Sequence, residues 1–349
     1  AWTGKGDGET AASVAVRGGI EYRVWFGTNR KPVDPDDPAR GFSGERSDRR
    51  TYYGRCSVFV PESHRIGSLG SSWITNALRR LAGKQDDRLA IRERHTLDRD
   101  PFWAAVVRQL AGVDKAKRHA LVFIHGYNVS FDEAALRAAQ IGADLGIEGA
   151  MAFFSWPSRG NTQDYLADGN TIDASEGAIT DFLVDVAQRS GADAVHVIAH
   201  SMGNRGVLRA VDRIAREAQA RAPVRFGHFI LAAADVDADV FRDLAAAYGK
   251  VARRTTLYVS SRDKALTASG KLAQFARAGL WPPVQVLPGI DTIDATGIDG
   301  SLLGHGYVAE VRPMLHDIHE LIFADTEPAR RFGLQRCSSD AGDYWTFRQ

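Results

Sequence analysis

The chain has little cysteine, almost no net charge and no long apolar run. Cys56 and Cys337 are the only cysteines among its 349 residues. Two cysteines are too few for a disulfide framework or for a zinc or iron–sulfur site built from thiolates. Whether these two pair with each other stays open, because the sequence does not place them within bonding distance.

The charge balance and the short apolar runs exclude two further classes. Lys and Arg number 44 against 43 Asp and Glu, which gives a net charge of +1 and no strong attraction to nucleic acid or anionic lipid. The longest apolar runs, Ala120–Ile124 and Phe229–Ala234, fall far short of the roughly 18–20 residues of a membrane-spanning helix. We therefore expect a soluble protein. No signal peptide is visible, and the sequence fits both a cytoplasmic protein and one exported after removal of a leader.

Composition divides the chain into four predicted parts. They are a flexible Gly- and Ala-rich tail (residues 1–20), an N-terminal extension that packs on the core (21–100), a catalytic domain (101–325) and a C-terminal tail (326–349). The extension contains two segments of strand character, Glu21–Phe26 and Tyr52–Val60. We expect these to lie against the catalytic domain.

Between about residues 120 and 323, short apolar runs alternate with amphipathic segments. The runs predict strands at Ala120–Ile124, Ala150–Phe154, Ala194–Ala199, His228–Ala233, Thr255–Val259 and Val284–Leu287. The segments predict helices at Pro101–Leu110, Phe131–Leu145, Ser175–Arg189, Met202–Ala220, Val240–Tyr248, Lys271–Ala278 and Val311–Phe323. Strands with crossover helices form a mostly parallel sheet with helices on both faces, and reactive groups gather at the carboxyl ends of its strands.

A serine stands at the turn between a predicted strand and a predicted helix. In Ala199–His200–Ser201–Met202–Gly203, the residues two before and two after the serine are small. A sharp strand–turn–helix corner requires this, and it presents Ser201 as a nucleophile and the N–H of Met202 as an oxyanion donor. An N-cap role for the serine does not explain the small neighbours. His200 leaves the turn in another direction, so we do not expect it to be the base.

A second loop offers the other oxyanion donor. His125–Gly126–Tyr127–Asn128 follows the predicted strand Ala120–Ile124. In folds with this nucleophile turn, the loop after that strand commonly carries the second donor beside a His-Gly pair. Gly126 lets the backbone approach the substrate closely. We assign the donor to the N–H of Tyr127, with Asn128 as the alternative.

The general base is expected to be a histidine that follows the serine in the chain. His305 lies in Gly304–His305–Gly306–Tyr307, within a glycine-rich loop that can fold back over the strand ends, and we favour it. His228 begins a strand, at the wrong edge of the sheet. His316 and His319 lie three apart in the last helix without a recognisable metal motif, so we predict no metal site.

The acid that orients this histidine has two candidates. Asp263 follows the predicted strand Thr255–Val259, and Asp235 follows the earlier run Phe229–Ala234. Since the acid usually follows the later strand in this architecture, we favour Asp263 and keep Asp235 as the alternative. A turn role for Asp263 and an N-cap role for Asp235 are the structural interpretations.

Five motifs in order resemble one family. They are Ile124–Asn128, Phe154–Ser158, Ala199–Asn204, Ser261–Leu266 and Gly304–Tyr307. With the front segment Trp25–Arg30 they cover about residues 20–325 and look like the bacterial alpha/beta-hydrolases of the esterase/lipase superfamily long catalogued as a domain of unknown function. The resemblance implies an α/β-hydrolase fold and a triad of Ser201, Asp263 and His305. It implies little about the substrate.

The surroundings of the site are expected to be open. Only about 20 residues separate the strand ending near Ala234 from the next one, so no large cap is inserted there. The polar segment 157–173 and the chain before residue 100 have to supply the cover. Around the substrate we place His125, Asn128, Trp156, His200 and Tyr307, with core packing as the equal alternative for Trp156 and a structural role as the main one for His200.

Together these residues predict a serine hydrolase that cleaves carboxylic esters of short to medium acyl chains. The reaction runs through an acyl-enzyme on Ser201 and needs no metal or organic cofactor. One alternative is a lipase or phospholipase acting on longer-chain lipid esters. The other belongs to a different class, a catalytically silent binding protein with the same fold. The sequence gives no oligomeric state.

Overall fold

The computed structural model describes residues 11–64, 66–67, 88–159, 164–218, 224–273, 275–282, 284–296, 298 and 312–348. The side chains of residues 264–265 and 272–273 are excluded from this description. The predicted base His305 and the predicted pocket residue Tyr307 lie outside the described residues.

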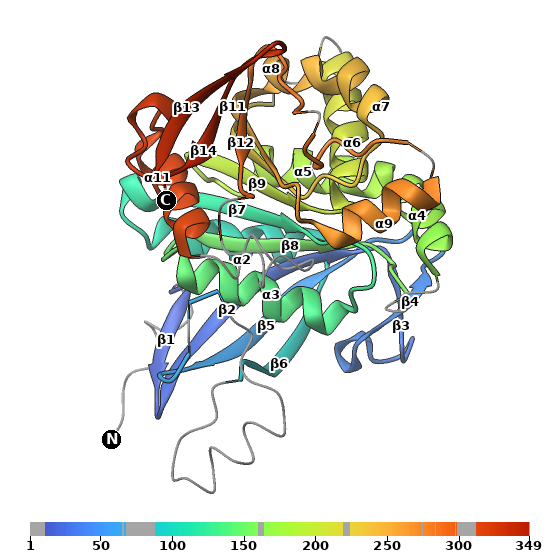
Figure 1. Cartoon of the computed structure of the whole chain (residues 1–349). Helices are drawn as coiled ribbons and strands as arrows, with labels where there is room; N and C mark the ends of the chain where they lie inside the picture. The colour runs from blue at the N-terminus through green and yellow to red at the C-terminus, as the bar shows by residue number, and fades with distance from the viewer. Residues whose placement is uncertain are drawn as a thin grey trace, which may run out of the picture.

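A twelve-stranded sheet forms the centre of the described chain (Figure 1). In spatial order its strands are β13 (Leu334–Ser339), β14 (Gly342–Phe347), β12 (Ile290–Asp294), β11 (Ala252–Val259), β10 (Phe226–Ala232), β9 (Ala194–His200), β7 (His119–Ile124), β8 (Ala150–Ser155), β2 (Gly19–Thr28), β5 (Tyr52–Pro61) and β6 (Ala90–Leu97), with β1 (Ser13–Val16) beside β2. The run from β14 to β2 is parallel, and the outer strands pair antiparallel. A small separate hairpin joins β3 (Arg30–Pro32) and β4 (Phe42–Arg46).

Helices cover both faces of this sheet, and each face has its own apolar core. On one face lie α2 (Arg99–Ala111), α5 (Glu176–Arg189), α6 (Gly203–Glu217), α7 (Ala238–Leu244) and α8 (Tyr248–Val251), and on the other α3 (Phe131–Asp144) and α11 (Arg312–Ala324). Two more helices, α4 (Tyr165–Ala174) and α9 (Lys264–Ala273), lie side by side in Figure 1. Short 3-10 turns occur at Pro38–Arg40, Lys115–Lys117, Ala245–Ala247 and Pro328–Arg330.

Local sequence explains the central elements. The residues of β7 after His119 are apolar and buried, because a strand inside a parallel sheet is covered on both faces. Helix α3 begins with a capping box, in which Ser130 and Glu133 each accept a hydrogen bond from the other's backbone N–H. The predicted α/β fold with its mostly parallel sheet is confirmed. So is the absence of a large cap, since the connection from β10 to β11 contains α7, the short 3-10 turn Ala245–Ala247 and α8 within about 20 residues.

Two predicted elements are misplaced, and one helix was not predicted. The last parallel strand of the domain is β12 rather than Val284–Leu287. The polar residues of β12 do not form the apolar run that predicts a buried strand. The strand tolerates Asp291 because Arg254 and Arg331, from elsewhere in the fold, neutralise its charge. Helix α9 begins seven residues before the predicted Lys271. Helix α4 lies within the segment that we predicted as a polar loop. Its sequence has no apolar stripe to predict a helix, and polar contacts hold it in place instead.

The predicted boundaries also differ from the structure at both ends. Within the predicted tail, residues 13–16 form β1 and β2 begins at Gly19, two residues before the predicted extension. Strand β2 pairs directly with β8 of the central sheet. The expected C-terminal tail contains the hairpin β13–β14, which extends the sheet beside β12. Backbone pairing with a distant strand stabilises these segments, and their composition does not reveal it. In the described ranges no helix is long and apolar enough to span a membrane.

Candidate active site

The turn between β9 and α6 holds Ser201 in a strained conformation. Its φ is 51°, in the left-handed region that non-glycine residues rarely adopt. Gly203 explains how the turn packs, because a Cβ there would lie 2.5 Å from the carbonyl oxygen of His125. The small residue two positions after the serine is therefore a steric requirement of this corner, as the motif predicts.

Asn204 fixes the turn from inside. Its side-chain Nδ2 donates to the carbonyl oxygens of Ala199, Ser201 and Ala232, each at 3.1 Å. The backbone adds two bonds, from Ser201 N to Ala232 O at 3.0 Å and from Asp235 N to Ser201 O at 3.2 Å. Sequence reasoning gave Asn204 no role, although an asparagine three residues after the serine was visible in the motif.

The hydroxyl of Ser201 is buried, and among the described residues it has no hydrogen-bond partner. A buried polar group left unpaired costs about 1–3 kcal/mol. Such groups are rare in folded proteins and call for an explanation, of which chemical function is one. Strain and an unpaired hydroxyl thus coincide at the predicted nucleophile.

The loop after β7 lies directly against this serine. A Cβ at Gly126 would lie 2.8 Å from the Cβ of Ser201, so only glycine allows the approach. The N–H of Asn128, the alternative oxyanion donor, donates to Asp168 Oδ2 at 3.4 Å. This contact engages the Asn128 N–H. The ring of Tyr127 meets the ring of Tyr165 edge-on, 5.3 Å between centroids.

His125 and Trp156 support that loop from the interior. Both side chains are buried, their rings stack 5.2 Å apart, and Trp156 Nε1 donates to His125 O at 2.8 Å. Burial, assisted by the positive charge of Arg30, lowers the pKa of His125 to about 3, so the imidazole is neutral. These contacts favour core packing over a place in the pocket wall.

The two candidate acids differ in their partners. Asp235, which follows β10, accepts hydrogen bonds from Tyr165 Oη at 2.8 Å and Ser269 Oγ at 2.5 Å. It also forms an ion pair with Arg277 Nε at 3.2 Å. The carboxylate therefore ties α4 and α9 to the end of β10, a structural role.

Asp263 follows β11 and is completely buried. Its Oδ1 accepts from Leu266 N at 2.9 Å, which caps the start of α9. A buried carboxylate at the end of the later strand suits the part of a triad acid. The structure thus places both aspartates at the carboxyl edge and engages Asp235 with three other side chains.

The remaining histidines have separate places. His200 is buried beneath the loop after β7, where its Nδ1 lies 3.3 Å from the position of a Cβ on Gly126. His228 lies near the amino end of β10, as expected. His316 is exposed on α11, and its Nδ1 lies 4.0 Å from Glu320 Oε2. Within the described ranges, no group of three or more His, Cys, Asp or Glu residues is arranged to hold a metal ion.

A family model described as alpha/beta hydrolase of unknown function (DUF900) matches residues 104–322. The chain belongs to this family. The match confirms the resemblance that the motifs indicated. The hydrolase is 28% identical to the uncharacterized protein alr1448 of Nostoc sp. in an alignment of 131 residues that covers 30% of this chain and 34% of that one. It therefore spans about a third of that relative. A crystal structure from Agrobacterium vitis S4, provisionally assigned as a hydrolase, covers 80% of this chain and 96% of its own with a TM-score of 0.36 and 10% identity.

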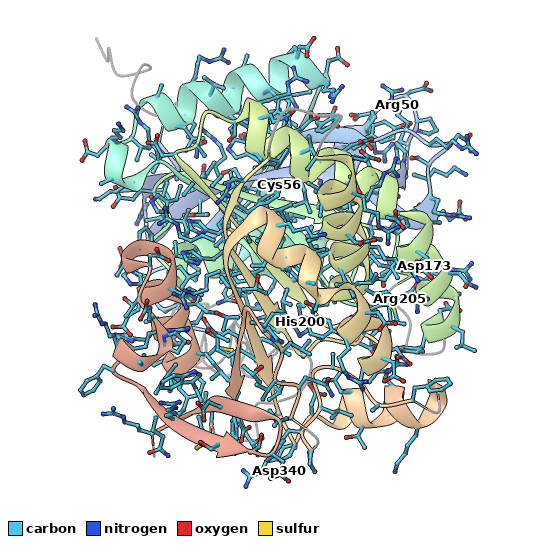
Figure 2. The ribbon with its side chains drawn as sticks, turned by 90° about the horizontal axis from the view of Figure 1, so that it is seen from above. Arg50, Cys56, Asp173, His200, Arg205 and Asp340 are labelled. Carbon is cyan, nitrogen blue, oxygen red and sulfur yellow. The ribbon has the colours of Figure 1, made fainter. Side chains whose placement is uncertain are left out.

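Helix α4 is the element of the hydrolase that sequence reasoning missed beside the site. Besides Tyr165, it carries Asp168, which accepts from Ser158 Oγ at 2.5 Å and Arg159 N at 3.0 Å. Asp173 holds the other end against α6 by two hydrogen bonds from Arg205, at 2.8 and 2.5 Å; both residues are labelled in Figure 2. Part of the segment 157–173, which we expected to cover the site, is thus helix α4, and hydrogen bonds hold both ends of this helix.

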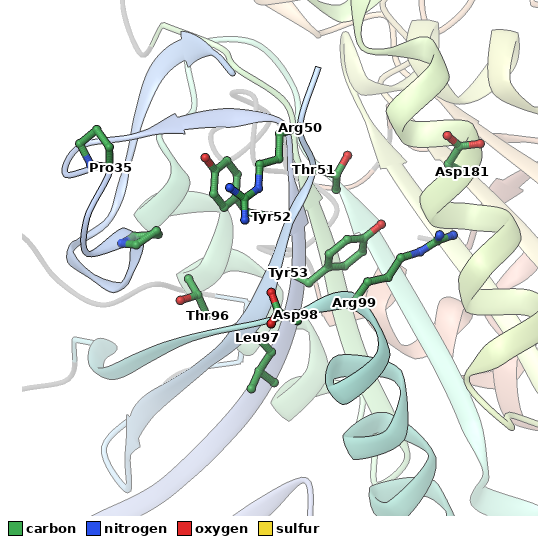
Figure 3. A pocket seen from close by; sticks show the side chains of 11 residues that line it. Pro35, Arg50, Thr51, Tyr52, Tyr53, Thr96, Leu97, Asp98, Arg99 and Asp181 are labelled. Atoms are coloured by element: carbon green, nitrogen blue, oxygen red, sulfur yellow. The ribbon is translucent and has the colours of Figure 1, made fainter. Parts of the chain in front are cut away.

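Two open pockets of the hydrolase lie on its N-terminal strands. One, of about 750 Å³, is shown in Figure 3, where Tyr52, Tyr53 and Arg99 line it. The other, of about 870 Å³, includes Asn29 and Arg49. Neither pocket is lined by a predicted catalytic residue, so we do not assign the substrate site to either of them.

Proposed function

We propose that the hydrolase cleaves carboxylic esters of short to medium acyl chains through an acyl-enzyme on Ser201. The observation that carries the proposal is the strained turn at Ser201, with its unpaired hydroxyl among the described residues and Gly126 packed against it. An N-cap serine needs neither the positive φ nor a second glycine loop at its side.

In the proposed mechanism, Ser201 Oγ attacks the ester carbonyl while His305 accepts its proton. The N–H groups of Met202 and Tyr127 bind the oxyanion, each contributing roughly 3–4 kcal/mol to the barrier reduction. The C–O bond to the alcohol then breaks, and His305 returns the proton to the leaving alcohol. Asp263 holds the imidazole in the required tautomer and stabilises its protonated form.

Deacylation repeats these steps with water. His305 removes a proton from a water molecule, which attacks the acyl carbonyl. The second tetrahedral intermediate collapses to the carboxylic acid, and the proton returns to Ser201 Oγ. The connection between β10 and β11 is short and contains no cap domain that would cover the strand ends, which supports an open site.

The test is hydrolysis of p-nitrophenyl esters of increasing acyl length. For Ser201→Ala we expect a loss of kcat of about 10⁴-fold or more and no labelling by a fluorophosphonate. Its melting temperature should be no lower than that of wild type, because the unpaired buried hydroxyl is removed. Ser190→Ala is the matched control, since Ser190 is also buried but lies at the C-cap of α5, where its Oγ accepts from Ala192 N at 3.1 Å. Equal turnover by wild type and Ser201→Ala contradicts the proposal. A rate maximum at long acyl chains favours the lipase, and an unlabelled, inactive wild type favours the silent binding protein.

A further inference from the structure

A buried chain of hydrogen bonds connects the N-terminal extension to the loop beside Ser201. Arg30 Nε lies 2.8 Å from Ser155 Oγ, which lies 3.1 Å from His125 Nε2. The other ring nitrogen, Nδ1, lies 2.8 Å from Gly126 O. All three side chains are at most 1% exposed. A polar chain this deep in the fold has to be satisfied at every link.

Chemistry fixes the direction of every link. A carbonyl oxygen only accepts, so His125 Nδ1 carries the proton and donates to Gly126 O. Because the imidazole is neutral, Nε2 has no proton and accepts from the hydroxyl of Ser155. Arg30 has only donors, and its Nε donates to Ser155 Oγ. All donors therefore point the same way, from the guanidinium to the carbonyl.

The last link sets the orientation of a peptide plane. The carbonyl of Gly126 and the N–H of Tyr127 belong to one peptide group, which is planar and trans, so they point in opposite directions. Fixing the carbonyl on His125 therefore fixes the direction of the Tyr127 N–H. Gly126 packs against Ser201, so this peptide lies beside the nucleophile.

We infer that Arg30, Ser155 and His125 are positioning residues that aim the Tyr127 N–H at the oxyanion. The inference rests on the proposed function, which makes this N–H a donor. The positive charge of Arg30, the first donor in this series of hydrogen bonds, strengthens the polarisation of the Gly126 carbonyl. Each donor in such a series polarises the next one. A polarised Gly126 carbonyl makes the Tyr127 N–H a better donor to negative charge.

Arg30 also holds the loop on the other side of Tyr127. Its Nη2 donates to Val129 O at 2.7 Å, and its Nη1 donates to Ser158 O at 2.8 Å and to Ser43 O at 3.1 Å. Burial lowers the pKa of this guanidinium to about 9, which leaves it charged at neutral pH. The N-terminal extension thus supports the loop after β7 through the hydrogen bonds of one arginine, Arg30.

The test compares Ser155→Ala with wild type in ester hydrolysis and in binding of an alkyl boronic acid, which mimics the tetrahedral oxyanion. We expect kcat to fall about 10- to 100-fold, a part of the loss caused by removing a whole oxyanion donor. Boronate affinity is expected to fall by the same factor while KM stays within about two-fold. A purely structural serine would not link these two losses.

Ser175→Ala is the matched control. Ser175 is equally buried. Its Oγ accepts from Asn29, the neighbour of Arg30, at 2.9 Å and donates to the carbonyl of Thr171 at 2.8 Å. We expect its kcat and boronate affinity to match wild type. Unchanged kcat in Ser155→Ala, or a loss that appears only in KM, overturns the inference while an active wild type keeps the proposed function. An inactive wild type that binds no boronate overturns the proposed function itself.

A measurement on the unmodified chain needs no variant to fold. Nitrogen-15 NMR of the labelled wild-type protein reports the tautomer of each histidine ring, and through-bond assignment identifies the signal of His125. We expect Nδ1 protonated and Nε2 unprotonated, without change down to pH 5. The opposite tautomer, or protonation of this ring near pH 6, overturns the inference.

Discussion

The two edges of the central sheet use polar residues in opposite ways. At the carboxyl edge, Ser201 is strained and the buried charges of Arg30 and Asp235 are held by directed hydrogen bonds to specific atoms. At the amino edge, His196 stacks between His119 and His228, on three adjacent strands, with ring centroids 5.1 and 4.9 Å apart. Directed hydrogen bonds order the polar groups around Ser201 at one edge, whereas stacked rings pack against one another at the other edge.

The amino-edge histidines show that the residue type alone does not reveal a function. Burial lowers the pKa of His228 to about 4 and that of His196 well below its ordinary value. Both rings are therefore neutral at pH 7, and His119 Nδ1 lies 3.0 Å from His196 Nε2. Of the nearby acids, Asp325 approaches His228 at 3.4 Å, but it is also paired with Arg253. These imidazoles serve as flat packing surfaces with a polar rim.

The largest expected effect separates the two aspartates of the carboxyl edge. In the proposed triad, Asp263→Asn should lower kcat by about 10⁴-fold, because the wrong histidine tautomer is favoured. Asp235→Asn leaves Arg277 without its buried counter-charge and should cost about 3–5 kcal/mol of stability. Below its melting point that variant should keep the wild-type pH–rate inflection. Rate profiles and urea unfolding of both variants check this; a reversed outcome makes Asp235 the acid.

A second pair of variants compares one glycine from each edge. A Cβ at Gly203 would meet the backbone carbonyl of His125 at 2.5 Å, and a Cβ at Gly227 would meet the ring of His196 at 2.7 Å. Both Gly→Ala changes should destabilise the fold by about 1–3 kcal/mol. Only Gly203→Ala should also lower kcat, by about 100-fold, since its collision displaces the oxyanion loop. Equal losses of kcat in the two variants would contradict the view that only the carboxyl edge positions groups for catalysis.

Acid should weaken the amino edge in a graded way. The folded pKa of His228 lies near 4, below its ordinary value of 6.5. As the pH falls from 6.5 to 4, the unfolded chain binds a proton before the folded chain does. The free energy of unfolding should therefore fall by about 1.4 kcal/mol per pH unit for each such histidine.

Urea unfolding between pH 7.5 and 4.5 measures this slope. His228→Asn should reduce it, whereas His316→Asn, which changes an exposed histidine on α11, should leave it as in wild type. A slope that persists in His228→Asn would assign the acid sensitivity to other groups.

Much of the parallel sheet and the turn at Ser201 could be predicted from the sequence, because local patterns encode them. Apolar runs mark strands buried on both faces, and small residues flank the serine because two backbones meet there. The prediction failed at β12 and α4, whose polar residues are neutralised by partners far along the chain. The roles of Asp263 and His305 stay predictions.

The sequence by itself determined the fold class and the serine at the centre of the candidate site. Both follow from sterics and periodicity within a few residues. Only the tertiary structure decided that Arg30 supports the loop at Gly126 and that Asp235 joins α4 to α9. The bonds from Arg30 to Ser155 and from Asp235 to α4 and α9 span dozens of residues or more. A buried polar group takes its partner from whatever packing brings within hydrogen-bond distance. Packing, rather than spacing along the chain, selects such partners.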